Sequence, residues 1–201
     1  MHAATLLELL PPLGLAARVL VAWKGGVLFV REVRGSLAEG RPIETVVLVA
    51  GTGSLLLDVA YELIGPRAGW PRPALGVPPA LRGAGLLLFG AGSVLQLWAR
   101  RALGGAWTVR MAAPSETALV TRGPYGLVRH PIYATAIASY LGLLIAQADL
   151  VGLIVFGAQV AGYARKAAVE DAILARSLQP AYERYRRRVR WRLLPGLWML
   201  G

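Results

Sequence analysis

The chain has 201 residues, of which 22 are Lys or Arg and 11 are Asp or Glu, so its formal net charge is +11. It is nevertheless 56% hydrophobic and only 16% charged, with a mean hydropathy of +0.52. Soluble basic proteins such as nucleic-acid binders are about a quarter charged, so this composition indicates a membrane protein instead. The sequence contains no cysteine, which excludes disulfides, thiolate nucleophiles and Cys-ligated metal centres.

The first apolar segment, Leu13 to Val30, contains Arg18 and Lys24. A cation at the centre of a transmembrane helix costs roughly 2.5–3.5 kcal/mol unless its side chain reaches the interface. The segment therefore either spans the membrane or lies at its surface. The residues before it lack a basic n-region and a small-residue cleavage site, so we expect no removed signal peptide.

Four further apolar runs each approach the ~20 residues that cross a bilayer as a helix. They are Ile43 to Ile64, Leu81 to Ala99, Ile132 to Ala148 and Leu150 to Ala164. The sequence thus predicts an all-α polytopic membrane protein with four to five transmembrane helices. Because only a few residues around Ala148 separate the last two runs, these helices must form an antiparallel hairpin.

Basic residues are distributed unevenly about the predicted spans. The tail from Arg165 to Gly201 carries nine Lys or Arg, and the segment from Arg100 to Arg129 lies on the same predicted side. The opposite side keeps chiefly Arg67 and Arg72. Since cytoplasmic loops are enriched in Lys and Arg, we expect the C-terminus in the cytoplasm.

The tail itself has two helical patterns. Apolar residues recur at helical spacing at Val169, Ile173, Leu174 and Leu178, and Pro180 then begins a stretch that puts Tyr182, Tyr185 and Val189 on one face. These patterns predict a C-terminal cap of two amphipathic helices at the cytoplasmic membrane surface.

His130 lies in a polar stretch, Gly123 to Tyr133, at the entry to a predicted transmembrane helix. Pro131 fits the first helical turn, and His130 would occupy the cap. One interpretation is an interfacial anchor, with Tyr and Arg at headgroup level. The other is a polar pocket at a helix N-terminus, which suits an anionic ligand group such as a carboxylate.

Two further groups of charged residues also allow both a structural and a functional interpretation. Lys166 and Glu170 share a helix face, either as a solvated i,i+4 pair or as part of a site, with Asp171 beside them. Asp58 and Glu62 lie within a predicted span, where acids are suspected of function, although pairing with Arg18 or Lys24 would give a structural reason.

The sequence lacks the motifs of the common soluble chemistries. It contains no dinucleotide-binding or phosphate-binding glycine loop, no nucleophile elbow and no His/Asp/Glu cluster at metal spacing, so no metal is expected. The basic run Arg184 to Arg192 is better explained by anionic membrane lipids than by nucleic acid, because it adjoins the predicted cytoplasmic membrane surface.

Several segments, in order, resemble the isoprenylcysteine carboxyl methyltransferases and their relatives, the phospholipid N-methyltransferases. The resemblance covers roughly Gln96 to Pro195 and includes Arg129-His130-Pro131-x-Tyr133, followed by the hairpin and by Glu170-Asp171. Its other elements are Leu103-Gly104-x-x-Trp107-Thr108, Leu119-Val120-Thr121-x-Gly123-Pro124-Tyr125 and Tyr182-x-x-Tyr185.

This resemblance implies a small multispan enzyme that uses S-adenosylmethionine in a pocket at the cytoplasmic membrane face. The residues at matched positions would contact the cofactor: Thr117, Leu119, Val120, Tyr125, His130, Pro131, Ile132, Tyr133 and Glu170. Lys166, Arg129 and Glu170 would serve catalysis, with Lys166 facing the substrate. Thr117 stands where the carboxyl methyltransferases have His, and Lys166 where they have Arg. Lysine lacks the bidentate fork that arginine offers a carboxylate.

The resulting hypothesis is a membrane methyltransferase of the isoprenylcysteine carboxyl methyltransferase type that acts on a lipophilic acceptor. There are two alternatives: a phospholipid N-methyltransferase, and a non-catalytic membrane or transport protein. Residues 1–99 would form the substrate side, and residues 100–201 the cofactor segment, hairpin and tail, within one structural unit. The sequence leaves the acceptor and the oligomeric state open.

Overall fold

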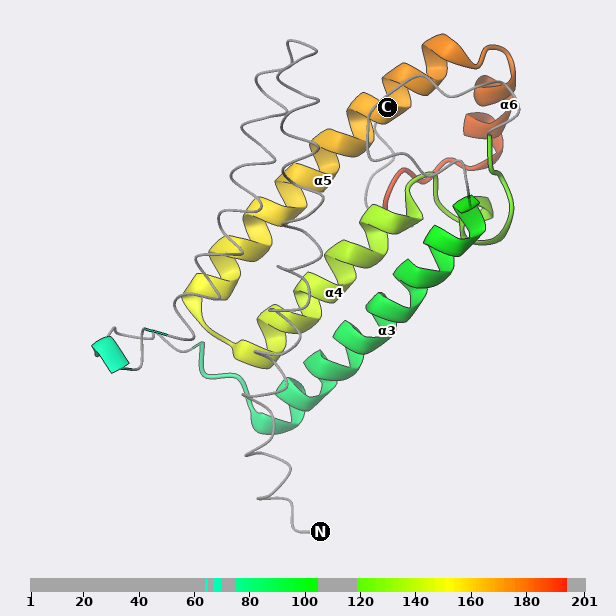
Figure 1. The fold of residues 1–201 in the computed structure, drawn as a ribbon. Helices are drawn as coiled ribbons and strands as arrows, with labels where there is room; N and C mark the ends of the chain where they lie inside the picture. The colour runs from blue at the N-terminus through cyan, green and yellow to red at the C-terminus, as the bar shows by residue number, and fades with distance from the viewer. Residues whose placement is uncertain (1–63, 65–66, 70–74, 105–118, 195–201) are drawn as a thin grey trace. The chain divides into compact units, whose positions relative to one another are not determined.

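A computed structural model describes residues 64, 67–69, 75–104 and 119–194 of the chain. These residues form helices and no strand: α3 (Pro79–Leu103), the short 3-10 helix η3 (Gly123–Gly126), α4 (Pro131–Gln147), α5 (Leu150–Ser177) and α6 (Ala181–Arg188) (Figure 1). The all-α prediction is thus confirmed for this part of the chain. The segments predicted at 13–30 and 43–64, with Asp58 and Glu62, lie outside the described residues except for Ile64.

Helix α3 contains the predicted span Leu81 to Ala99. Within the described ranges it alone is both long and apolar enough to cross a membrane. Large apolar side chains remain exposed along it, with Leu87 at 77% and Val94 at 66%. Arg100 and Arg101 occupy its last turn, where cations interact favourably with the negative end of the helix dipole. Gly104 follows with a φ of +55°, the left-handed conformation that commonly ends helices.

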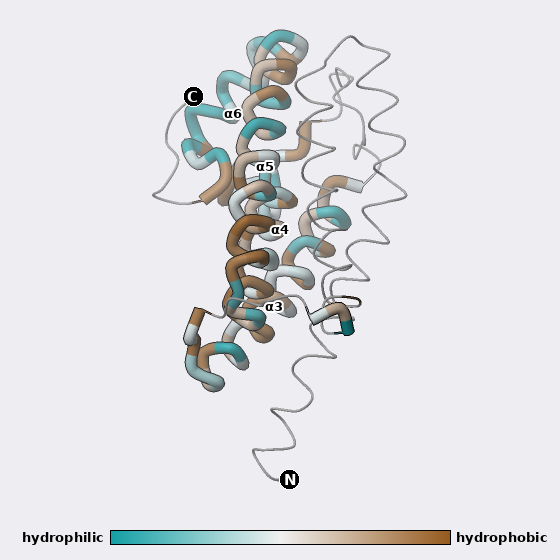
Figure 2. Tube along the Cα trace, turned by 90° about the vertical axis from the view of Figure 1, so that its left-hand side faces the viewer, coloured by the Kyte–Doolittle hydropathy of each residue, from teal (hydrophilic) through white to brown (hydrophobic). Residues whose placement is uncertain are grey.

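Helices α4 and α5 form the predicted antiparallel hairpin (Figure 1). The turn between them consists of Ala148, which has a φ of +56°, and Asp149. Asp149 caps α5, because its Oδ1 accepts a hydrogen bond of 2.6 Å from the backbone N–H of Gly152. Apolar residues fill α4 and the first half of α5, whereas α6 is largely hydrophilic (Figure 2).

One expectation about the tail is wrong. The apolar pattern around Val169 to Leu174 is not a separate amphipathic helix, because α5 continues without a break from Leu150 to Ser177. No proline or glycine interrupts the stretch from Tyr163 to Ser177, so nothing in the sequence ends the helix at the predicted membrane boundary. The helical stretch that was predicted to begin at Pro180 is confirmed as α6.

The chain divides into two compact units, residues 1–90 with 139–162 and residues 91–138 with 163–201. In the first unit, α3 and α4 approach each other at two glycines. A Cβ atom on Gly85 would lie 2.7 Å from the carbonyl oxygen of Gly142, and one on Gly142 would lie 2.5 Å from the amide nitrogen of Phe89. Gly85 therefore allows the close packing of the two helices, whereas no atom of the described residues lies within 4 Å of a Cβ built on Gly83 or Gly90.

The second unit is built around α6. Tyr182 and Tyr185 are buried on its inner face, and together with Val189, which caps its C-terminus, they pack with Leu178 against Leu119 and Leu174. The η3 turn passes close to the end of α3, where a Cβ on Gly123 would lie 3.8 Å from the Trp98 ring. Gln96 of α3 also donates a hydrogen bond of 3.4 Å to the carbonyl of Ile132 in α4. These contacts hold the residues before α4 between α3 and α6.

Candidate functional site

The polar stretch before α4 is fixed by pairing with the segment that follows α6. The backbone N–H of Arg129 donates to the carbonyl of Trp191 at 2.9 Å, and that of His130 donates to the carbonyl of Arg192 at 3.0 Å. Helix α4 then begins at Pro131, and the carbonyl of His130 accepts from the amides of Tyr133 and Ala134. His130 is therefore the predicted cap, with its side chain held at the helix N-terminus.

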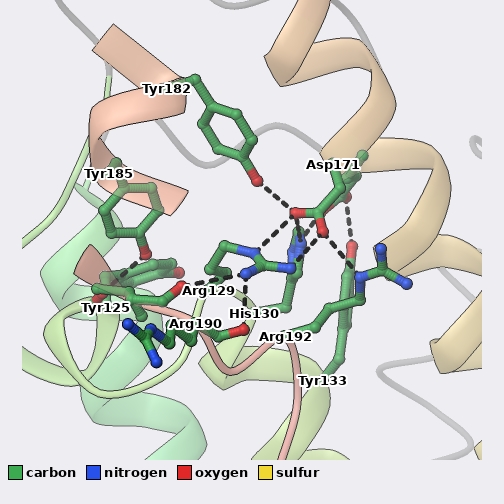
Figure 3. A network of polar contacts seen from close by, with 11 residues as sticks. Tyr125, Arg129, His130, Tyr133, Asp171, Tyr182, Tyr185, Arg190 and Arg192 are labelled. Carbon is green, nitrogen blue, oxygen red and sulfur yellow. Dashed lines mark hydrogen bonds and ion pairs between the residues drawn. The ribbon is translucent and has the colours of Figure 1, made fainter. Parts of the chain in front are cut away.

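Asp171 is the centre of the polar contacts (Figure 3). Its Oδ2 lies 2.9 Å from Nη2 of Arg129 and 2.8 Å from Nε of Arg192, and its Oδ1 lies 2.7 Å from Nε2 of His130. The hydroxyl of Tyr182 also donates to Oδ1. We call these five residues, Arg129, His130, Asp171, Tyr182 and Arg192, the Asp171 cluster. Burying one carboxylate is costly, and here it is compensated by several charge-assisted hydrogen bonds.

Arg129 is fully engaged in this cluster. Besides its two contacts with Asp171, its Nη1 donates to the carbonyls of Val189 and Arg190 at 3.1 and 2.9 Å. Only 6% of the residue is exposed. The guanidinium thus ties α5 and the segment after α6 to the start of α4, an arrangement suited to positioning His130.

His130 lies between two carboxylates. Its Nε2 faces Asp171, and its Nδ1 is 3.2 Å from Oε2 of Glu170. Burial alone would lower the His130 pKa, but the hydrogen bonds to Asp171 and Glu170 outweigh it and raise the pKa above the ordinary value. Both ring nitrogens therefore face a carboxylate oxygen, which favours the protonated form of the imidazole.

The same contacts act on the two acids in the opposite direction. Burial raises the pKa of Asp171, but hydrogen bonds from His130, Arg129 and Tyr182 overcome this and bring that pKa well below its usual range. The pKa of Glu170 is also lowered, because the His130 contact, the Tyr133 hydroxyl and the charge of Lys166 outweigh its burial. Both carboxylates are therefore ionised at neutral pH.

Glu170 differs from Asp171 in its access to solvent. Its side chain is 27% exposed, against 5% for Asp171. The hydroxyl of Tyr133 donates to Oε1 of Glu170, and Lys166 Nζ lies 5.7 Å from the centre of the Tyr133 ring. That ring also stacks on His130 and on Tyr163, with ring centres 5.8 and 5.4 Å apart. One carboxylate, one ammonium and an aromatic stack therefore share the partly open side of the site.

The remaining tyrosines support the site from α6. Tyr182 is completely buried, and Tyr185 donates a hydrogen bond of 2.7 Å to the carbonyl of Tyr125 in η3. Burial raises the pKa of all three phenols, Tyr125, Tyr182 and Tyr185, above the ordinary value. They remain neutral hydrogen-bond donors.

Most of the predicted site residues gather in this second unit. Leu119, Val120, Ile132, Tyr133, Lys166 and Glu170 are partly exposed. The other predicted site residues are buried beneath this partly exposed group: Tyr125, Arg129, His130 and Pro131. Thr117 lies outside the described residues.

Sequence reasoning missed the roles of Asp171, Tyr182, Arg192 and Tyr163. Asp171 and Tyr182 belonged to recognised motifs, but helical spacing indicated only that Tyr182 faces the core, not that its hydroxyl reaches an acid eleven residues earlier. Arg192 lies in a run of arginines, and nothing local distinguishes it from the exposed ones. The contact of Arg192 with Asp171 forms only because residues 191 and 192 pair with the residues that precede α4.

The described residues therefore combine one apolar helix long enough to span a bilayer with a buried ionic cluster beside a helix N-terminus. Residues 81–181, half of the chain, match the family model described as phospholipid methyltransferase. The chain belongs to this family of membrane-associated lipid methyltransferases, which confirms the resemblance found in the sequence. The comparison with curated proteins gave no match.

Proposed function

We propose that this protein is an integral-membrane, S-adenosylmethionine-dependent methyltransferase that acts on a lipophilic acceptor. The observation that carries the proposal is the position of the partly exposed Glu170 carboxylate, beside His130 and Tyr133, within the segment that matches the family. The proposal includes four to five transmembrane helices, with the C-terminus and the site on the cytoplasmic side.

The residues present fit the cofactor. Glu170 offers an ionised carboxylate for its hydroxyl or ammonium groups, and the partly exposed Leu119, Val120 and Ile132 offer apolar surface for its adenine. When bound, S-adenosylmethionine supplies an electrophilic methyl group on a sulfonium. Tyr133 and His130 would hold the Glu170 carboxylate in one orientation, while the buried Tyr125, Arg129 and Pro131 would position the backbone before α4.

Lys166 would face the acceptor, as the resemblance implies. Its ammonium lies over the Tyr133 ring and lowers the pKa of Glu170, so it belongs to the same side of the site. An ammonium can attract a carboxylate acceptor of the isoprenylcysteine type, although without the bidentate geometry of arginine. Methyl transfer to an oxygen anion needs no general base, so positioning and exclusion of water would supply the acceleration.

A phospholipid amine is the second candidate acceptor, favoured by the description of the matching family and by the Glu170 carboxylate. Glu170 suits attraction of a cationic headgroup better than proton abstraction, because its lowered pKa makes it a weak base. An amine acceptor would therefore have to lose its proton to the solvent before its nitrogen attacks the methyl group.

Labelled methyl transfer into lipid extracts tests the proposal and separates the two acceptors. The purified protein, supplied with S-adenosylmethionine labelled on the methyl group, should label material that partitions into organic solvent. Base treatment would release labelled methanol from a methyl ester but not from an N-methylated amine. Equal activity on a water-soluble headgroup analogue would contradict a lipophilic acceptor, and no labelled lipid at all would contradict the enzyme.

A further inference from the structure

The outer face of α6 and the segment that follows it carry a dense group of arginines. Residues 181–192 contain six arginines and one acid, Glu183. Four of the arginines are exposed, and we call them the arginine face: Arg184, Arg187, Arg188 and Arg190. Glu183 lies 3.5 Å from Arg187 and 3.6 Å from Arg186, so it offsets only part of this charge.

The inner face of α6 fixes the direction of these arginines. Tyr182, Tyr185 and Val189 are buried and pack with Leu178, and Tyr182 is bonded to Asp171. Rotation of α6 would remove the tyrosines from this core. The arginine face therefore stays outward, whether or not a partner is bound.

The arginine face lies near the end of the candidate membrane span. Nη2 of Arg188 donates a hydrogen bond of 3.4 Å to the carbonyl of Thr121, and Gly123, two residues further on, adjoins Trp98 and Ala102 of α3. With 25 residues, α3 is about 37 Å long and exceeds the ~30 Å hydrocarbon layer. Its last turn, with Arg100 and Arg101, is the basic end of the helix and suits the headgroup layer.

We propose that the arginine face binds the anionic phospholipid headgroups of the bilayer in which α3 is embedded. Charge complementarity and proximity to the membrane surface support this partner, because electrostatic attraction extends only about 8 Å at physiological salt. Each arginine near an anionic surface strengthens binding by on the order of fivefold. An acidic protein or a nucleic acid would have to displace lipid that is already within reach.

Hydrogen exchange of the full chain in lipid nanodiscs tests the proposal. We expect the amides of residues 184–190 to exchange roughly tenfold more slowly in phosphatidylcholine containing about 30% phosphatidylglycerol than in phosphatidylcholine alone, in low salt of about 50 mM. About 500 mM salt should remove the difference. Equal exchange in the two lipid compositions would overturn the proposal.

Two matched triple variants distinguish charge from folding. Arg184, Arg187 and Arg190 are changed together to Gln or together to Lys, while Arg188 is kept because it contacts Thr121. The Lys variant should keep the lipid-dependent protection, and the Gln variant should lose it. Full protection in the Gln variant would overturn the proposal.

Competing partners are tested in neutral nanodiscs. An acidic polypeptide such as polyglutamate, or a single-stranded oligonucleotide, should protect residues 184–190 less than anionic lipid does. Stronger protection by either would reassign the surface to that partner. No step of these experiments involves methyl transfer, so their failure would leave the proposed function standing.

Discussion

Oδ1 of Asp171 lies 2.7 Å from Nε2 of His130, although 41 residues separate them in the chain. This contact joins the long helix α5 to the cap of α4, and Arg129, Arg192 and Tyr182 complete it from three further positions. Asp171 and its partners Arg129, His130 and Tyr182 are buried, whereas Arg192 and the neighbouring Glu170 are partly exposed. The two adjacent acids thus have different tasks: Asp171 holds the site together, and Glu170 faces its open side.

Asp171→Asn should destabilise the protein by about 3–5 kcal/mol, because removing one partner of a buried ion pair leaves Arg129 and Arg192 uncompensated. Denaturant or thermal unfolding in detergent would measure the loss. Glu183→Gln is the matched control, since this acid is 39% exposed and pairs only at the surface, so we expect a change within about 0.5 kcal/mol. Equal effects of the two variants would refute the central position of Asp171.

Arg129→Lys distinguishes a positioning role from direct catalysis. A lysine keeps the charge but cannot contact both Asp171 oxygens and the carbonyls of Val189 and Arg190 together. We expect a stability loss of about 2–4 kcal/mol, with methyl transfer and cofactor affinity falling together. Unchanged stability with a lower turnover number would instead show that Arg129 acts directly on the reacting groups.

Protonation of His130 should make stability depend on pH. Its pKa in the folded protein is raised above the ordinary 6.5, so the folded state binds the proton more tightly than the unfolded state does. This contribution is complete below about pH 6.5 and is lost as the pH rises through the folded pKa, by at most ~1.4 kcal/mol per pH unit.

The melting temperature of the wild type should therefore fall as the pH rises from about 6.5 to 9. The His130→Gln variant should lack this part of the pH dependence. The difference between the two melting-temperature profiles therefore gives the contribution of the His130 side chain. Nitrogen NMR of labelled histidine offers a direct check, because the sequence contains only His2 and His130. A His130 resonance that titrates below pH 6.5 would contradict the account.

Gly142→Ala should destabilise the packing of α3 on α4 by about 1–3 kcal/mol, because its new methyl group would lie 2.5 Å from the backbone of Phe89. The control is Gly90→Ala in α3, where no atom of the part of the chain that the structure describes lies within 4 Å. Alanine should raise helix stability there by roughly 0.5–1 kcal/mol. Thermal unfolding of both variants would show opposite signs, and a neutral Gly142→Ala would contradict the close approach.

Local patterns predicted the helices better than the contacts between them. Pro131 marks the start of α4, and the short connection at Ala148 forces the hairpin, because both act over a few residues. The extension of α5 to Ser177 was missed, because a hydropathy change at Ala164 ends an apolar stretch without ending a helix. The membrane boundary and the helix boundary are set by different forces.

The residues of the candidate site also differ in whether the sequence could predict them. Motif residues such as His130 and Glu170 could be found from the sequence, and they do adjoin. The contribution of Arg192 could not be found from the sequence. Its contact with Asp171 requires the backbone of residues 191 and 192 to pair with Arg129 and His130. Such pairing between distant segments leaves no periodic pattern.

The most direct test of the account is calorimetric binding of S-adenosylhomocysteine to the purified full chain and to Glu170→Gln. The wild type should bind, and Glu170→Gln should lose at least tenfold in affinity while keeping the wild-type melting temperature to within a few degrees, because Glu170 faces the open side of the site. Asp171→Asn should lose both affinity and stability. A folded wild-type protein that binds no S-adenosylhomocysteine would contradict the proposed methyltransferase.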